Sequence, residues 1–137
     1  MTLSPTPLSR ILRPVLMFEA IILNAGTGLL CLVAPAAFIR QFTSEPFPDV
    51  TLEFIRWYGV LLWVLTYVVL RILPQRDDRT LAPVVEALLF GDFVHLVVIY
   101  LFYRAVPVWS FAFILMLLFT LSLATVRSLW LAGYHRR

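Results

Sequence analysis

The stretch LAPVVEALLFGDFVHLVVIYLFY, residues 81–103, decides the fold of this chain. It can cross a bilayer as one helix, because about 20 consecutive apolar residues span ~30 Å of hydrocarbon. Three further apolar runs lie at 15–34, 54–73 and 107–131. Lipid admits only helices or closed barrels, and four spans without period-two alternation cannot close a barrel. We therefore predict an all-α, integral membrane four-helix bundle that forms a single transmembrane domain over residues 1–137.

The composition excludes an ordinary soluble domain. Residues of hydrophobic type make up 61% of the chain and charged residues 14%, against about 45–50% and about 25% in soluble domains. A soluble chain of 137 residues cannot bury so much apolar surface, because small domains leave a large share of their surface in water. The lipid bilayer is thus the predicted partner. The basic residues sit at helix ends and form no continuous basic face, so we expect no nucleic-acid binding.

The chain lacks the familiar motifs of soluble enzymes. It has no phosphate loop, no GxSxG elbow and no HExxH motif. His95 is the only histidine within the apolar runs, and with Asp92 and Glu19 it makes a thin set of metal ligands. We therefore predict no metal site and no cofactor. The single cysteine, Cys31, cannot form an internal disulfide and is expected to be a buried thiol.

Prolines mark the ends of the predicted helices. Pro14, Pro83 and Pro107 fall near helix starts, where a missing N–H costs little. Pro35 and Pro74 follow helix ends. Loops are predicted at 41–51 and 75–80. The first run is expected to remain as a span, because it is longer than the apolar core of a signal peptide and contains a glutamate.

Arginines predict the orientation in the membrane. With four spans, both termini and the second loop lie on one side. That side carries most of the arginines, namely Arg10, Arg13, Arg71, Arg76, Arg79, Arg136 and Arg137. Short loops rich in positive residues stay cytoplasmic, so a multi-pass protein with both termini in the cytoplasm is predicted. All eleven basic residues are arginine, which is typical of proteins encoded by GC-rich genomes. The bacterial inner membrane is favoured over an organelle membrane.

Ionisable residues inside the spans are the strongest chemical signal. A charge at the bilayer centre costs about 2.5–3.5 kcal/mol on insertion scales, so such residues usually face the bundle interior and pair. At ~1.5 Å per residue, one layer lies about 16–22 Å from the predicted cytoplasmic ends and a second within about 5–11 Å. The deeper layer comprises Asp92, His95 and Arg56, with Asn24 at a similar level; the other comprises Glu19, Glu86 and Arg127. In the shallower layer, we expect Glu19 or Glu86 to pair with Arg127.

The deeper layer supplies the candidate site. Asp92 and His95 are three residues apart and share a helix face, which Tyr103 continues. An ionised Asp92 held by Arg56 could orient His95 as a proton shuttle, the division of labour that general acid–base chemistry needs. Asp92 and His95 are therefore the candidate catalytic residues. The candidate ligand-binding residues are Arg56, Glu19, Asn24, Trp63 and Tyr103.

Small residues indicate where helices touch. Ala20, Asn24 and Gly28 recur every four residues, and Gly59 and Gly91 lie near Arg56 and Asp92. Small side chains let backbones approach closely in lipid. The alternative, that glycine is simply common in membrane helices, stays open at this point.

Three functions stay open on these residues. The buried charges form a pocket for a small lipophilic molecule, with or without catalysis. Alternatively, they only clamp the helices of a structural or accessory membrane subunit. In the third alternative they serve a proton-coupled transporter of small molecules. A homo-oligomer is compatible with each of these functions and is expected most for a transporter.

The layout resembles that of small four-helix membrane families, including DoxX-like proteins. The resemblance rests on Gly28 with Pro35, on Arg56-Trp57-Tyr58-Gly59 and on Gly91-Asp92-Phe93-Val94-His95. It covers the four-span layout and implies a fold but little function. Small multidrug exporters also have four helices and a glutamate in the first. The longer loops here, and the added charges of the second and third spans, depart from that plan.

Overall fold

The computed structural model describes residues 7–75, 77–107 and 109–136. Within these ranges the regular structure is helical and contains no strand. Four helices are long and apolar enough to cross a membrane, which confirms the predicted all-α four-helix bundle. The elements are α1 (Pro7–Phe18), the π-helix η1 (Glu19–Ala25), α2 (Gly26–Val33), α3 (Pro35–Ile39), α4 (Asp49–Ile72), α5 (Asp78–Ala105) and α6 (Phe111–His135).

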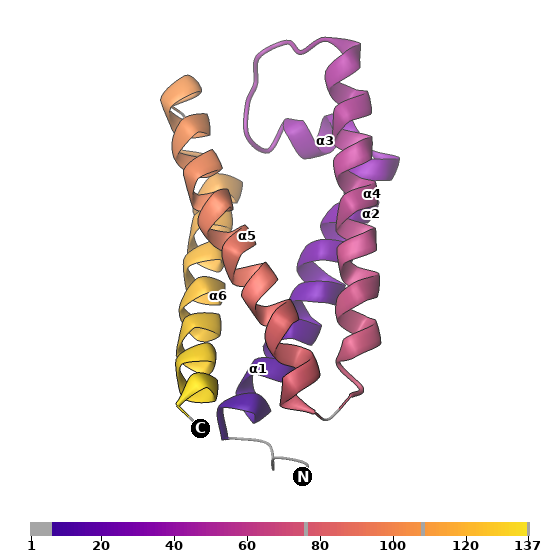
Figure 1. Ribbon diagram of the computed structural model, residues 1–137. Coiled ribbons are helices and arrows are strands. Elements are labelled where there is room, and N and C mark those ends of the chain that lie inside the picture. The colour runs from indigo at the N-terminus through magenta and orange to yellow at the C-terminus, as the bar shows by residue number, and fades with distance from the viewer. Residues whose placement is uncertain (1–6, 76, 108, 137) are drawn as a thin grey trace.

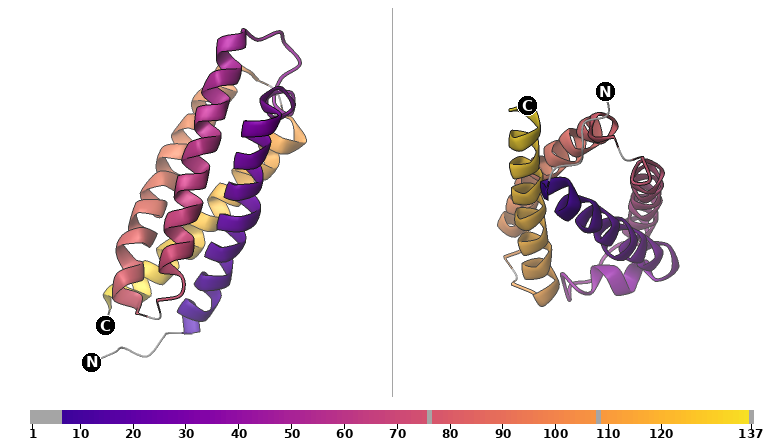
Figure 2. Two further views of the ribbon diagram at one scale, coloured as in Figure 1. Left: turned by 90° about the vertical axis from the view of Figure 1, so that its right-hand side faces the viewer. Right: turned by 90° about the horizontal axis from the view of Figure 1, so that it is seen from below.

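The spans form two helix pairs (Figure 1). The first span, made of α1, η1 and α2, runs along α4, and α5 runs along α6 (Figure 2). The start of α1, the end of α4, the start of α5 and the end of α6 lie together, and we name this the α1 end (Figure 1). The opposite, α3 end holds α3 and the connection to α4. Toward the α3 end the two pairs diverge (Figure 1).

The helices begin earlier or later than hydropathy indicated. The first span and α4 start several residues before Val15 and Phe54, because a helix can continue past the apolar run wherever its polar residues meet water. Pro14 and Pro83 were predicted to lie near helix starts. They lie inside α1 and α5 instead, past the first turn of each helix. Pro107 precedes α6, which instead begins after Ser110, whose Oγ accepts a hydrogen bond from Phe113 N.

Glycines bring the first span and α4 into close contact. A Cβ at Gly59 would lie 2.8 Å from Gly28 O, and a Cβ at Gly28 would lie 2.9 Å from Trp63 Cδ1. About two turns away, Thr66 Oγ1 lies 3.1 Å from Ala20 O in the π-helix. The predicted role of small residues is therefore confirmed at Gly28 and Gly59. It is wrong at Gly91, which has nothing within 4 Å of its would-be Cβ.

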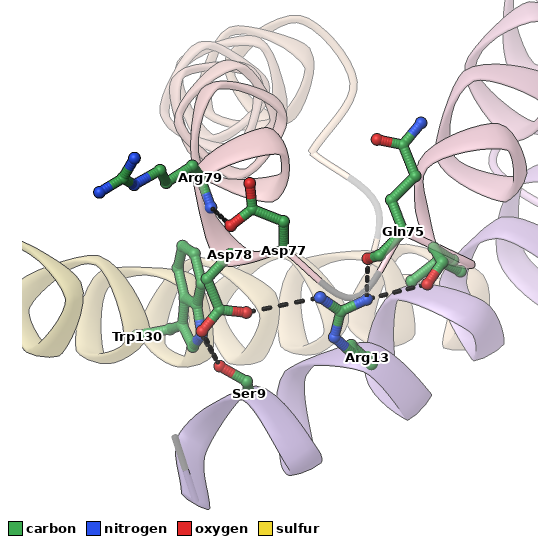
Figure 3. A network of polar contacts seen from close by, with 8 residues as sticks. Ser9, Arg13, Gln75, Asp77, Asp78, Arg79 and Trp130 are labelled. Carbon is green, nitrogen blue, oxygen red and sulfur yellow. Dashed lines mark hydrogen bonds and ion pairs between the residues drawn. The ribbon is translucent and has the colours of Figure 1, made fainter. Parts of the chain in front are cut away.

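The two pairs join through an apolar core near the α1 end. All four spans contribute side chains to it: Leu12, Leu16, Val69, Leu73, Leu81, Val85, Trp130 and Leu131 among others. A polar network closes this end of the molecule (Figure 3). Arg13 Nη1 donates to the carbonyl oxygens of Leu73 and Gln75, both at 2.8 Å. Arg13 thus supplies donors to two carbonyls of the residues that directly follow α4.

The same network holds α1 against α5 and α6. Ser9 Oγ donates to Asp78 Oδ2 at 2.7 Å, and Trp130 Nε1 donates to Ser9 Oγ at 3.0 Å (Figure 3). Arg13 Nη2 lies 3.4 Å from Asp78 Oδ1. Asp78 is buried, although the sequence predicted a loop over residues 75–80. Its carboxylate links the first span to the third.

Candidate functional site

A buried charge triad ties three spans together. Arg127 of α6, only 1% exposed, donates through Nη1 to Asp92 Oδ2 of α5 and through Nη2 to Glu19 Oε2 of η1. Both carboxylates are themselves buried. The predicted pairing of Glu19 with Arg127 is confirmed. Glu86 instead lies 3.3 Å from His135 Nε2, and both side chains are exposed.

Arg56 does not reach Asp92, so that predicted pairing is wrong. Arg56 Nη1 pairs with Glu53 Oε1, one turn earlier in α4, and both side chains are largely exposed. Near the α3 end α4 packs on α2 and α3, while the pair that carries Asp92 diverges from it. A local carboxylate therefore neutralises Arg56, and Arg127 neutralises Asp92. That Arg56 contacts a ligand stays a prediction.

Thr120, and not Asp92, orients the His95 ring. His95 Nδ1 lies 3.2 Å from Thr120 Oγ1. Thr120 also donates to Met116 O at 2.9 Å, which uses its only hydrogen, so its oxygen accepts from Nδ1–H. With the Thr120 hydrogen on Met116 O, a neutral His95 carries its proton on Nδ1 and has Nε2 as an acceptor. Within the described part of the chain, no hydrogen bond joins His95 to Asp92, and the predicted orienting role of Asp92 is corrected.

Asn24 and His95 form a second polar level above the triad. Asn24 follows Glu19 by five residues and His95 follows Asp92 by three. Because both helices run from the α1 end toward the α3 end, the two side chains lie about one turn beyond their triad partners. Asn24 Nδ2 is a buried donor with no acceptor among the described residues, and so is Arg127 Nε in the triad. Leaving a buried donor unmet costs about 1–3 kcal/mol.

The other two predicted ligand residues lie away from the triad. Trp63 packs its indole ring over Gly28 at the contact of the first span with α4. The Tyr103 ring lies 5.0 Å from Trp109 and 6.3 Å from Phe113 between ring centroids, close to the connection of α5 with α6. Their assignment as ligand contacts stays a prediction.

Sequence reasoning missed two features of the site. Thr120 was not singled out, although a polar residue inside the fourth span is the kind of side chain that partners a buried histidine. The π-helix from Glu19 to Ala25 had no signal in the sequence that we could recognise. Such stretches frequently occur at functional sites, and this one carries both Glu19 and Asn24.

Comparison with family models, with curated proteins and with solved structures found no match for this chain.

Proposed function

We propose that this membrane protein binds a small lipophilic molecule carrying one hydroxyl group, at the level of Asn24 and His95. The observation that carries the proposal is the unmet hydrogen bonding at this level. Asn24 Nδ2 is a buried donor without an acceptor in the described residues, and the Thr120 contact leaves His95 Nε2 as an acceptor. A hydroxyl group can accept from the first and donate to the second.

The surroundings suit an apolar ligand body. Aromatic side chains from both helix pairs lie at the α3 end. There the Phe42 and Phe102 ring centroids are 6.2 Å apart, and those of Phe102 and Phe113 are 5.9 Å apart. Ligand sites in proteins are mostly apolar with a few polar groups that fix orientation. The charge triad then serves as the scaffold that fixes the spans below the site.

Thermal unfolding in lipid nanodiscs tests the proposal. The probes are long-chain alcohols, each compared with an alkane of equal length. A ligand of the site raises the unfolding temperature of the parent protein, and the alkane does not. Asn24→Leu and His95→Leu abolish the shift, whereas the control Arg104→Gln, an exposed change on α5, keeps it. If no polar probe outperforms its alkane, or if both leucine variants keep the shift, the proposal fails.

A second candidate, proton-coupled transport, is favoured by one observation. The triad holds two carboxylates against one guanidinium, so it carries an excess negative charge when all three groups are ionised. An uncompensated charge is costly in a membrane interior, and one bound proton removes it. Proton flux into proteoliposomes, compared between the parent and Glu19→Gln, tests this candidate. Equal flux in the two proteins would exclude it.

A further inference from the structure

A pocket of about 370 Å³ opens on the outside of the bundle at the α1 end, far from the polar level. Pockets that hold small ligands are commonly about 300–1,000 Å³, so the volume suffices for part of a lipid. The lining is almost entirely apolar apart from one guanidinium. It comes from α1 and from the end of α4: Arg13, Pro14, Met17, Leu70, Leu73 and Pro74.

Two further arginines lie one turn from lining residues of this pocket. Arg10 precedes Arg13 by three residues and Pro14 by four, so it lies one turn along the same face of α1. Arg71 has the same spacing to Pro74. Arg10 and Arg71 are exposed, and no acidic residue lines the pocket. Arg10 therefore lies at the α1 end of the pocket. The long side chain of Arg71, which begins at the level of Leu70, can extend toward the same end.

We propose that the pocket binds an anionic phospholipid of the surrounding bilayer. The start of an acyl chain packs against Met17 and Leu70, and the phosphate lies between Arg10 and Arg71. Charge complementarity argues for this occupant, because basic pockets between membrane helices recognise anionic headgroups. The position agrees, since α1 begins and α4 ends here, where a span passes from hydrocarbon to headgroups.

Arg13 has a positioning part in this site. Its Nη1 is committed to the two carbonyl oxygens of the α4 end, and its Nη2 lies 3.4 Å from Asp78 Oδ1. The side chain is 20% exposed, and Nε with the second Nη2 hydrogen remains for a phosphate oxygen. Most of the attraction therefore comes from Arg10 and Arg71, which can be replaced without breaking the network of Figure 3.

Lipid retention measured by native mass spectrometry tests the proposal. The protein is purified from nanodiscs of phosphatidylcholine with phosphatidylglycerol, and lipids that remain bound are counted. We expect one phosphatidylglycerol per chain, retained in preference to phosphatidylcholine. The double variant Arg10→Gln/Arg71→Gln should reduce this preference roughly thirtyfold, because each arginine near a charged surface contributes ~1 kcal/mol. Leu70→Trp, which fills the pocket, should also release the lipid.

A control variant makes the outcome decisive. Arg79→Gln/Arg104→Gln removes the same charge elsewhere, and the Arg79 side chain points away from Arg13 (Figure 3). This double variant should retain the lipid. An equal loss of phosphatidylglycerol from this control variant would mean that the effect is a general attraction between the protein's positive charge and anionic lipid, and would overturn the proposal. Equal retention of phosphatidylglycerol and phosphatidylcholine by the parent protein would also overturn it. Displacement of phosphatidylglycerol by millimolar inorganic phosphate would assign the site to free anions instead.

Discussion

Gly28 and Gly59 face each other where the first span meets α4, so closely that a Cβ on Gly59 would lie 2.8 Å from Gly28 O. The obstructing atom belongs to the backbone, and a side chain cannot be accommodated by a change of rotamer. In lipid, packing of this kind is a main source of helix association, because there is no hydrophobic drive between helices.

Gly59→Ala should therefore weaken the bundle. We expect the free energy of unfolding in detergent to fall by about 1–3 kcal/mol, the usual cost of overpacking. Gly91→Ala is the matched control, because its added methyl group meets open space. It should leave stability unchanged or raise it by up to about 1 kcal/mol through helix propensity. Equal losses in the two variants would show that the contact of Gly28 with Gly59 is unimportant.

Arg13 should stabilise the protein more than its neighbour Arg10. Arg13→Ala leaves the carbonyls of Leu73 and Gln75 without their donor and removes the partner of Asp78. Hydrogen bonds to charged groups contribute about 1.5–3 kcal/mol, and we expect a loss of that size in the free energy of unfolding. Arg10→Ala, an exposed change on the same helix, should stay within about 0.5 kcal/mol. Comparable losses would contradict the capping role of Arg13.

Hydropathy was sufficient to predict the fold, but not to predict which face each helix turns toward its neighbours. Residues 81–103 and the other runs identified the spans, since only length and polarity decide whether a segment crosses lipid. The depth estimate also paired Glu19 with Arg127 correctly. It failed for Arg56, because depth does not say which neighbour a helix faces. Glu53, three residues earlier, was the local signal for the actual partner of Arg56.

The network at the α1 end could not have been predicted from the apolar runs. Ser9 precedes the first run, and Asp78 stands in a charged stretch that reads as a solvated turn. Their burial depends on how α1, α5 and α6 meet, which is a tertiary property. The orienting contact of His95 with Thr120 was missed for the same reason, since the two residues lie on different helices.

The arginine distribution predicts that both termini are cytoplasmic, and labelling with a membrane-impermeant maleimide checks this. In intact cells, a cysteine introduced at Ser44 should react, because this predicted topology places the connection at the α3 end outside the cell. A cysteine at Gln75 should react only after the membrane is permeabilised. The parent chain is the control, since Cys31 is buried. Labelling of the cysteine at Gln75 but not of the one at Ser44 in intact cells would show the opposite topology.

The unfolding free energies of variants at Arg127, Glu19 and Asp92 test the central claim, that one arginine holds two carboxylates inside the membrane. Arg127→Met alone should cost about 3–5 kcal/mol, because it leaves buried charges unpaired. Arg56→Gln, which breaks an exposed pair, should cost no more than about 1 kcal/mol. Adding Glu19→Gln and Asp92→Asn to Arg127→Met should recover most of the loss, since the triple variant buries no charge. A triple variant whose loss equals the sum of the single losses would contradict the triad.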